Sequence, residues 1–172
     1  PNSLQWLDLH QNAITGLENY FSSSDNSIVE DRKLTHLDAS FNRIKELGPQ
    51  NVPNDIKTLI LNDNSIATIV PYTFFKKPNL KHVDLTLNKM ETIDRNALRL
   101  SSELMNTISL SPKFLMGGNP VRCDCHMAWF KTINSDNSVQ NYPIIADLES
   151  IYCQLLHSKE RAVMPLVETN AE

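Results

Sequence analysis

Apolar and polar positions recur in a fixed order along this chain, and an asparagine marks each recurrence. Five asparagines can be aligned: Asn12, Asn42, Asn64, Asn88 and Asn119. Three positions before them stand the small or apolar residues Leu9, Ala39, Leu61, Leu85 and Met116. Five positions before them stand Leu7, Leu37, Leu59, Val83 and Phe114. This alternation with a period of two predicts a short strand with one buried face in every recurrence.

Further apolar positions flank each predicted strand. Eight residues before the asparagines are Leu4, Leu34, Ile56 and Leu80, with Ser111 out of pattern. Two and five residues after the first four are Ile14, Ile44, Ile66 and Met90, then Leu17, Leu47, Ile69 and Ile93. Nine or ten residues after come Phe21, Val52, Phe74 and Leu98, which are predicted to fill the opposite side of each coil. The asparagine stands where the chain leaves the strand, and its amide can pair with backbone groups that the bend leaves free.

This order, L-x-x-L-x-L-x-x-N, resembles the leucine-rich repeat. The resemblance implies an α/β solenoid with short parallel strands on the concave face and an irregular convex side. Four repeats and a degenerate fifth are expected over residues 1–116. An amphipathic helical array is disfavoured, because alternation with a period of two does not suit a helix. Stacking of the coils is expected to supply the stability, since no coil buries its apolar face alone.

Two of the steps between asparagines are longer than the others. The additional segments are "FSSSDNSIVEDRK" (residues 21–33) and "LRLSSELMNTISLSPK" (residues 98–113). The first is polar and predicts a loop, whereas the second has helix-forming character. Loops on a rigid scaffold often carry recognition, but most are tolerated insertions.

The outward residues of the predicted strands are the candidate partner-contact positions. They are Trp6, Asp8, His10, His36, Asp38, Ser40, Thr58, Ile60, Asn62, His82, Asp84 and Thr86. A His-x-Asp pair occurs at 36/38 and again at 82/84, but catalysis needs a held and partly buried constellation, and an open sheet does not provide one. We therefore expect no enzyme activity. Contact with a protein partner is the more plausible role, for which Trp6 and Ile60 are the least expected residues on a solvated face.

The three cysteines cluster around the end of the repeats. Cys123 and Cys125 follow Asn119 directly, and Cys153 comes later. The segment "HMAWFKTIN" (residues 126–134) predicts a helix with Met127, Phe130 and Ile133 on one face, and Trp129 is expected to be a mostly buried plug over the open end of the solenoid. A disulfide could hold such a cap in an oxidising compartment. Zinc is the alternative, with His126 as a fourth ligand, but the spacing matches common zinc sites poorly.

Within this region, "GNPVRCDCHMAWF" followed by "IYC" is similar to the C-terminal flanking cap of extracellular leucine-rich repeat proteins. That resemblance implies a bond between Cys123 and Cys153, a missing partner for Cys125, and a truncated cap over residues 117–172. The segments "KLTHLDASFNRI", "NVPNDIKTLILNDNSI", "FLMGGNPVRCDC", "YPIIADLESIYC" and "KERAVMPL" resemble the ectodomain of the Toll receptor family, closest to the long insect subgroup.

The Toll resemblance implies an extracellular ligand-recognition module of a single-pass membrane receptor in innate immune or developmental signalling. Its implied partner is a cystine-knot cytokine of the Spätzle kind or another surface receptor, and no cofactor or metal is expected. A cell-adhesion or guidance protein is the alternative. One feature is contrary to an extracellular location, because no N-x-S/T sequon for glycosylation occurs. The net charge of −4, without a Lys/Arg cluster along the sequence, disfavours nucleic acid as a partner.

The N-terminal coil is expected to be the weak point of the chain. Leu4, Leu7, Leu9 and Ile14 follow closely on Pro1 with no cysteine-rich cap before them, which suggests a piece of a longer solenoid. The uncovered strand edge and its apolar surface are expected to favour self-association.

Overall fold

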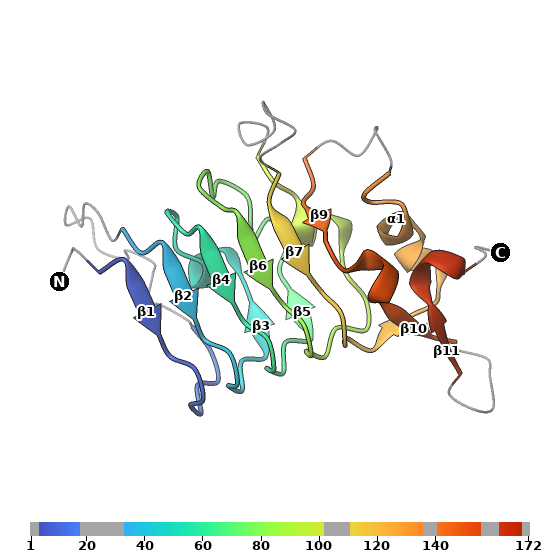
Figure 1. Cartoon of the computed structure of the whole chain (residues 1–172), viewed down its shortest axis with the longest axis horizontal. Coiled ribbons are helices and arrows are strands. Elements are labelled where there is room, and N and C mark those ends of the chain that lie inside the picture. Colours follow the sequence, from blue (N-terminus) through green and yellow to red (C-terminus); the bar gives the residue numbers. More distant parts are fainter. Residues whose placement is uncertain (1–3, 18–32, 102–110, 136–140, 156–161, 170–172) are drawn as a thin grey trace.

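The computed structural model describes residues 4–17, 33–101, 111–135, 141–155 and 162–169. Its main feature is a parallel sheet of six short strands in one layer, drawn side by side in Figure 1. The strands are β1 (Trp6–Asp8), β2 (His36–Asp38), β4 (Thr58–Ile60), β6 (His82–Asp84), β7 (Lys113–Leu115) and β9 (Ile144–Ile145). The predicted solenoid of leucine-rich repeats is therefore confirmed. We number its coils 1 to 5 by their asparagines.

The strand register places the predicted apolar residues in one column. The column consists of Leu7, Leu37, Leu59, Val83, Phe114 and Ile145. All but Leu7 are buried, and the convex positions Val52, Phe74 and Leu98 are buried as well. Phe74 on the convex side of coil 3 meets Phe114 in the strand of coil 5 edge to face, with 4.8 Å between ring centroids, so the contact reaches across coil 4. Phe21 lies outside the described residues.

The asparagines form a continuous ladder between coils. The side chain of Asn88 donates to the Leu61 carbonyl of the preceding coil at 3.0 Å and accepts from the backbone N–H of Ile66 at 2.9 Å. The same pair of bonds recurs at Asn42, Asn64 and Asn119. The expected role of the asparagine amide is confirmed: it satisfies polar groups that the bend would otherwise leave buried and unpaired.

The residue before each asparagine has a left-handed backbone. The positive φ angles are found at Gln11, Phe41, Asp63, Leu87 and Gly118, between 53° and 73°. For residues other than glycine this conformation carries a steric penalty of about 1 kcal/mol. Gly118 also makes a close approach, because a Cβ there would lie 2.5 Å from Cδ2 of Leu87. The bend thus demands glycine in coil 5, while coils 2 and 4 hold exposed Phe41 and Leu87 there.

The convex side is partly regular. Strands β3 (Glu46–Leu47) and β5 (Thr68–Ile69) pair in parallel behind the main sheet, and 3-10 turns η1 (Pro49–Asn51) and η2 (Arg95–Leu98) complete coils 2 and 4. Coil 4 does not extend this small sheet within the described residues. The backbone N–H of Ile93 instead donates to Sδ of Met127 at 3.3 Å, which ties the coil to the cap.

The sixth strand and the aspartate that follows it complete the hydrogen bonds of coil 5. β9 pairs with β7, and Asp147, two residues after Ile145, accepts from the backbone N–H of Met116 at 3.0 Å and of Gly117 at 2.7 Å. In coil 4 the equivalent N–H, that of Leu85, donates to the Leu115 carbonyl of the next coil, so the Asp147 carboxylate takes the place of that carbonyl. The sheet itself continues beyond residue 116, and the division of the chain at 116/117 stays a prediction.

The cap combines short helical turns with a second sheet. Strand β10 (Tyr152–Gln154) lies between β8 (Val121–Arg122) and β11 (Val163–Pro165). The helical parts are η5 (Cys125–Met127), α1 (Ala128–Lys131), η6 (Leu148–Ser150) and η7 (Leu166–Glu168). Asp124 begins η5 by accepting from the backbone N–H of His126 at 2.9 Å. The expected short helix is present, and the three-stranded sheet is an addition that the sequence pattern did not predict.

The cap helix buries the apolar face that the sequence predicted. Met127, Phe130 and Ile133 are buried on this face, and Trp129 is partly buried and packs against the core, as expected. Its ring packs beside Tyr142 and carries the guanidinium of Arg95 at 5.7 Å from the ring centroid. Phe130 is more deeply buried than Trp129, because the spacing of three residues that buries Met127 and Ile133 also includes Phe130.

The two inserted segments lie largely outside the described residues. Of the first, only Lys33 is described, and of the second, residues 98–101 and 111–113. The loop and helix predictions for them therefore stay predictions. Across the described ranges, no helix is both long and apolar enough to cross a membrane.

Candidate partner-binding face

Three columns of side chains build the outer face of the six-stranded sheet. The register aligns Trp6, His36, Thr58, His82 and Lys113 in one column, and Asp8, Asp38, Ile60, Asp84 and Leu115 in the next. His10, Ser40, Asn62, Thr86 and Gly117 occupy the equivalent positions two residues further on. The predicted contact residues thus come together on one continuous surface. Whether they bind a partner stays a prediction.

The N-terminal end of this face is aromatic. Trp6 is 64% exposed and stacks on the ring of His36, with 5.1 Å between centroids and 11° between planes. The Nδ1 atom of His36 lies 2.8 Å from Oγ1 of Thr35, which fixes the orientation of the imidazole. A large, pre-oriented aromatic surface of this kind is what binding interfaces use as an anchor.

Carboxylates of the second column brace the ends of their own strands. Asp38 Oδ1 accepts from the backbone N–H and the hydroxyl of Ser40, at 2.9 and 2.6 Å. Asp84 makes the same pair of bonds to Thr86, at 2.9 and 2.7 Å. These aspartates therefore have a structural role that competes with a functional one, and each keeps its second oxygen for a partner.

Coil 1 uses an ion pair in place of the hydroxyl. Asp8 Oδ1 lies 2.6 Å from Nδ1 of His10 and also accepts from its backbone N–H at 3.0 Å. The bonds from His10, the backbone bond first, hold the pKa of Asp8 below its ordinary value. The side-chain hydrogen bond to Asp8 in turn raises the pKa of His10. Both groups are exposed, so solvent screens this interaction strongly.

Coil 3 interrupts the acidic column with an apolar residue. Ile60 stands where its neighbours carry Asp38 and Asp84, and Asn62 donates to Oδ2 of Asp63 at 2.8 Å instead of capping its own strand. The half-buried Ile60 lies between two carboxylates. This part of the face therefore combines an apolar centre with a polar rim, the composition of many protein interfaces.

The two His-x-Asp pairs do not form one constellation. The register separates His36 from His82 by Thr58, and Asp38 and Asp84 are each engaged with the residue two positions on. The described residues contain no group of three or more His, Cys, Asp or Glu side chains that could hold a metal ion. The chemistry that this face offers is therefore hydrogen bonding and apolar contact.

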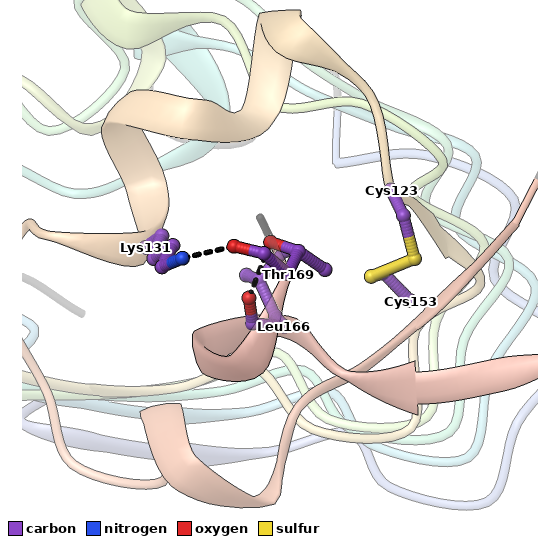
Figure 2. The surroundings of a disulfide bond; sticks show 5 residues. All are labelled: Cys123, Lys131, Cys153, Leu166 and Thr169. Atoms are coloured by element: carbon purple, nitrogen blue, oxygen red, sulfur yellow. Dashed lines mark hydrogen bonds between the residues drawn. A yellow bond between two sulfur atoms is a disulfide. The ribbon is translucent and has the colours of Figure 1, made fainter. Parts of the chain in front are cut away.

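A disulfide joins the two ends of the cap. Cys123 is bonded to Cys153 with 5.1 Å between their Cα atoms, and both sulfurs are consumed in the bond. Figure 2 shows the nearby link in which Nζ of Lys131 donates to the backbone carbonyl of Thr169, whose hydroxyl donates to the Leu166 carbonyl. These contacts tie α1 to η7 beside the disulfide. Cys125 is an exposed free thiol, with Sγ 3.9 Å from Nδ1 of His126.

Sequence reasoning missed one buried cation on the convex side. Lys77 is buried, and its ammonium donates to the Val52 carbonyl at 2.6 Å, to Asn54 at 2.8 Å and to the Pro49 carbonyl at 3.3 Å. Burial lowers the pKa of Lys77 to about 8. The side chain ties two coils together. The sequence gave no signal for this burial, because Lys77 stands beside a second lysine, Lys76, which is exposed.

Comparisons with known proteins agree with this architecture. The family model described as leucine rich repeat matches residues 54–109. Toll-like receptor 7 of Drosophila melanogaster is 38% identical over 166 residues, which is 96% of this chain and 11% of the receptor. Toll-like receptor 9 of Mus musculus is 29% identical over 75% of this chain and 12% of its own length. The chain thus spans about a tenth of these receptors.

Two solved structures share the fold. Human 5T4, a trophoblast glycoprotein, superposes with a TM-score of 0.61 at 20% identity, over 80% of this chain and 45% of its own. A chain of the Drosophila Toll–Spätzle complex superposes with a TM-score of 0.59 at 18% identity, over 96% of this chain and 19% of its own. The chain has the leucine-rich repeat fold, and its sequence is similar to a part of these Toll-like receptors.

Proposed function

We propose that this chain is an extracellular ligand-recognition segment of a Toll-like cell-surface receptor, acting in innate immune or developmental signalling. The observation that carries the proposal is the 38% identity to Toll-like receptor 7 over 96% of the chain. A disulfide-bonded cap supports an extracellular location, because such bonds persist in oxidising compartments. The segment binds and performs no chemistry of its own.

The proposed partner is a protein ligand, such as a cystine-knot cytokine of the Spätzle kind, and the proposed contact surface is the outer face of the six-stranded sheet. Support for the surface comes from its aromatic end at Trp6 and His36 and its apolar centre at Ile60. We also propose that residues 1–116 are the repeats, which supply most of this face, and that residues 117–172 are the cap that closes the solenoid. We further propose that Cys125 pairs with a fourth cysteine of the receptor cap, outside this chain.

Surface plasmon resonance tests this function. The secreted, disulfide-bonded chain is immobilised and a Spätzle-like cystine-knot protein is passed over it, with a leucine-rich repeat protein of unrelated surface as the reference. Saturable binding to this chain alone supports the proposal. Equal responses on both surfaces would remove the support for ligand recognition by this segment.

Homophilic adhesion is the second candidate. Leu4 and Trp6 are exposed, and Leu7 is only half-buried where the equivalent residues of later coils are fully buried. A second copy could cover this surface, since β1 pairs only with β2 in the described sheet. Sedimentation equilibrium tests it: a dimer at micromolar concentration that Ile60→Ser on the outer face disperses favours adhesion, whereas a dimer that only Leu4→Ser disperses is the self-association expected of the uncovered edge.

A further inference from the structure

We propose that the junction of coil 4 and the cap binds a protein segment that presents a carboxylate next to an apolar side chain, through Arg95, Trp129 and Tyr142. We call these three residues the junction site. The site contains none of the residues of the outer face, so the inference does not depend on the proposed protein ligand. It rests on an arginine that is held in place without an acceptor for its N–H groups, and on the aromatic rings beside it.

Two aromatic rings form the floor of the junction site. Trp129 belongs to α1, and Tyr142 lies in the segment just before β9, at the C-terminal end of the solenoid (Figure 1). Their ring centroids are 5.8 Å apart, and the buried ring of Phe130 meets Trp129 edge to face at 5.4 Å. Both floor residues are partly buried and pack against the core, so their rings are held in place while part of each stays open to solvent. Fixed aromatic surfaces of this kind supply anchor contacts in protein interfaces.

Arg95 lies over the ring of Trp129. It is the first residue of η2, and its guanidinium carbon Cζ is 5.7 Å from the ring centroid, within the range of a cation–π attraction. A guanidinium carries five N–H donors in its own plane, and attraction to the face of a ring uses none of them. Within the ranges that the structure describes, Arg95 makes no hydrogen bond and no ion pair. The arginine is therefore positioned by Trp129 but keeps its donors for an acceptor that the described residues do not supply.

A second cation and one acid border the junction site. Arg99 is exposed and forms no ion pair with any described residue, and the bond from the backbone N–H of Leu100 to the Asn141 carbonyl, at 2.8 Å, brings its segment beside the aromatic floor. The acid is Asp94, whose carboxylate accepts from the backbone N–H of Asn96 at 2.7 Å. With two arginines and one acid the region has a small positive charge, which suits one or two carboxylates better than a densely charged polyanion.

The chemistry of the partner follows from these two parts of the site. A planar guanidinium matches the two oxygens of a carboxylate, and the paired hydrogen bonds are stronger than bonds between neutral groups. Trp129 and Tyr142 offer apolar ring surface directly beside Arg95, which an aliphatic side chain next to that carboxylate can cover. An acidic and apolar segment of a protein provides both groups, whereas inorganic anions and sulfated polysaccharides provide only the charge.

NMR signals of the tryptophan indole N–H groups test the proposal. The chain has two tryptophans, so Trp6 on the outer face is an internal reference for Trp129. A synthetic peptide in which two glutamates alternate with two leucines is the probe. We expect it to shift the Trp129 signal saturably and to leave the Trp6 signal in place. Glutamine in place of glutamate in the peptide should raise Kd by about tenfold or more, and glycine in place of leucine by about fivefold or more.

Substitutions in the chain separate the contributions. Arg95→Gln should raise the Kd of the probe by about tenfold or more, and Arg95→Lys by about fivefold or more, because an ammonium keeps the charge but cannot form the paired bonds. The matched control is Arg43→Gln, which replaces an exposed arginine of coil 2 that has no ion pair in the described ranges and should change Kd by less than about twofold. Thermal melts confirm that each variant is folded. No saturable shift of the Trp129 signal in the parent, equal losses for Arg95→Gln and Arg43→Gln, or equally tight binding of the glutamine peptide or of heparin would each overturn the proposal.

Discussion

Replacing Asn88 with alanine probes the ladder that joins the coils. The Asn88 side chain is 2% exposed and makes four hydrogen bonds, two of which cross to the preceding coil. The alanine variant leaves the backbone N–H of Ile66 without its partner. The Leu61 carbonyl loses one donor but keeps a second, because Asn64 donates to it at 3.1 Å.

The magnitude follows from these contacts. A buried N–H without a partner costs about 1–3 kcal/mol, and each remaining bond contributes about 0.5–1.5 kcal/mol, part of which the second donors retain. We therefore expect the free energy of unfolding to fall by about 2–4 kcal/mol. For a chain of this size each kcal/mol shifts the melting temperature by about 2–4 °C, so Tm should fall by about 4–16 °C.

Asn12→Ala is the matched control for this prediction. Asn12 occupies the same position in coil 1, but it is exposed and donates only to the Leu9 and His10 carbonyls of its own coil. Its replacement should cost less than about 1 kcal/mol. Urea unfolding followed by circular dichroism measures both variants. If the two variants lose equal stability, the hydrogen bonds between coils do not support the solenoid and the reasoning fails.

Three further predictions concern single positions. Met127→Leu removes the sulfur that accepts a buried backbone N–H and should lower the free energy of unfolding by about 1–3 kcal/mol. Met90→Leu is the control, because Met90 is also buried but its sulfur accepts no such bond, and it should cost less than about 1.5 kcal/mol. Equal losses of stability for the two variants in chemical denaturation would contradict the role of the Met127 sulfur as an acceptor. Gly118→Ala should destabilise by more than about 1 kcal/mol, because it combines a positive φ with a close approach to Leu87; an unchanged melting temperature would show that the bend adapts. The pKa of Lys77 is lowered from 10.5 to about 8, so between these pH values the unfolded chain holds a proton that the folded chain has released, and the free energy of unfolding rises with pH. Lys77→Met should remove this rise in urea titrations at several pH values. The same rise in the variant would refute the prediction.

The repeat, the core and the role of the asparagines could be predicted from the sequence. Each coil repeats the same local contacts, so the columns containing Leu37 and Phe114 and the ladder position of Asn88 recur at readable intervals. The short cap helix was predictable for the same reason, because Met127 and Phe130 are spaced by one helical turn. Trp129 packs against the core as predicted, but the sequence did not single out Phe130, which the helical face buries more deeply.

Features that depend on neighbouring coils could not be read from the sequence. Phe41 and Leu87 hold left-handed backbones because the ladder fixes the bend on both sides of them, against their own steric preference. The burial of Lys77 could not be read either, because its ammonium finds its acceptors at Val52 and Asn54 only when coil 3 stacks on coil 2.

The central claim is that the outer face of the sheet recognises a protein ligand, and paired affinity measurements test it most directly. A Spätzle-like cystine-knot protein is titrated against the parent chain, Trp6→Ala and Tyr72→Ala, the last an exposed aromatic residue on the convex side as a matched control. We predict that Trp6→Ala raises Kd by about 30-fold or more, as expected for an aromatic anchor, and that Tyr72→Ala changes Kd by less than about twofold. Absence of binding to the parent, or a larger loss for Tyr72→Ala than for Trp6→Ala, would contradict the account.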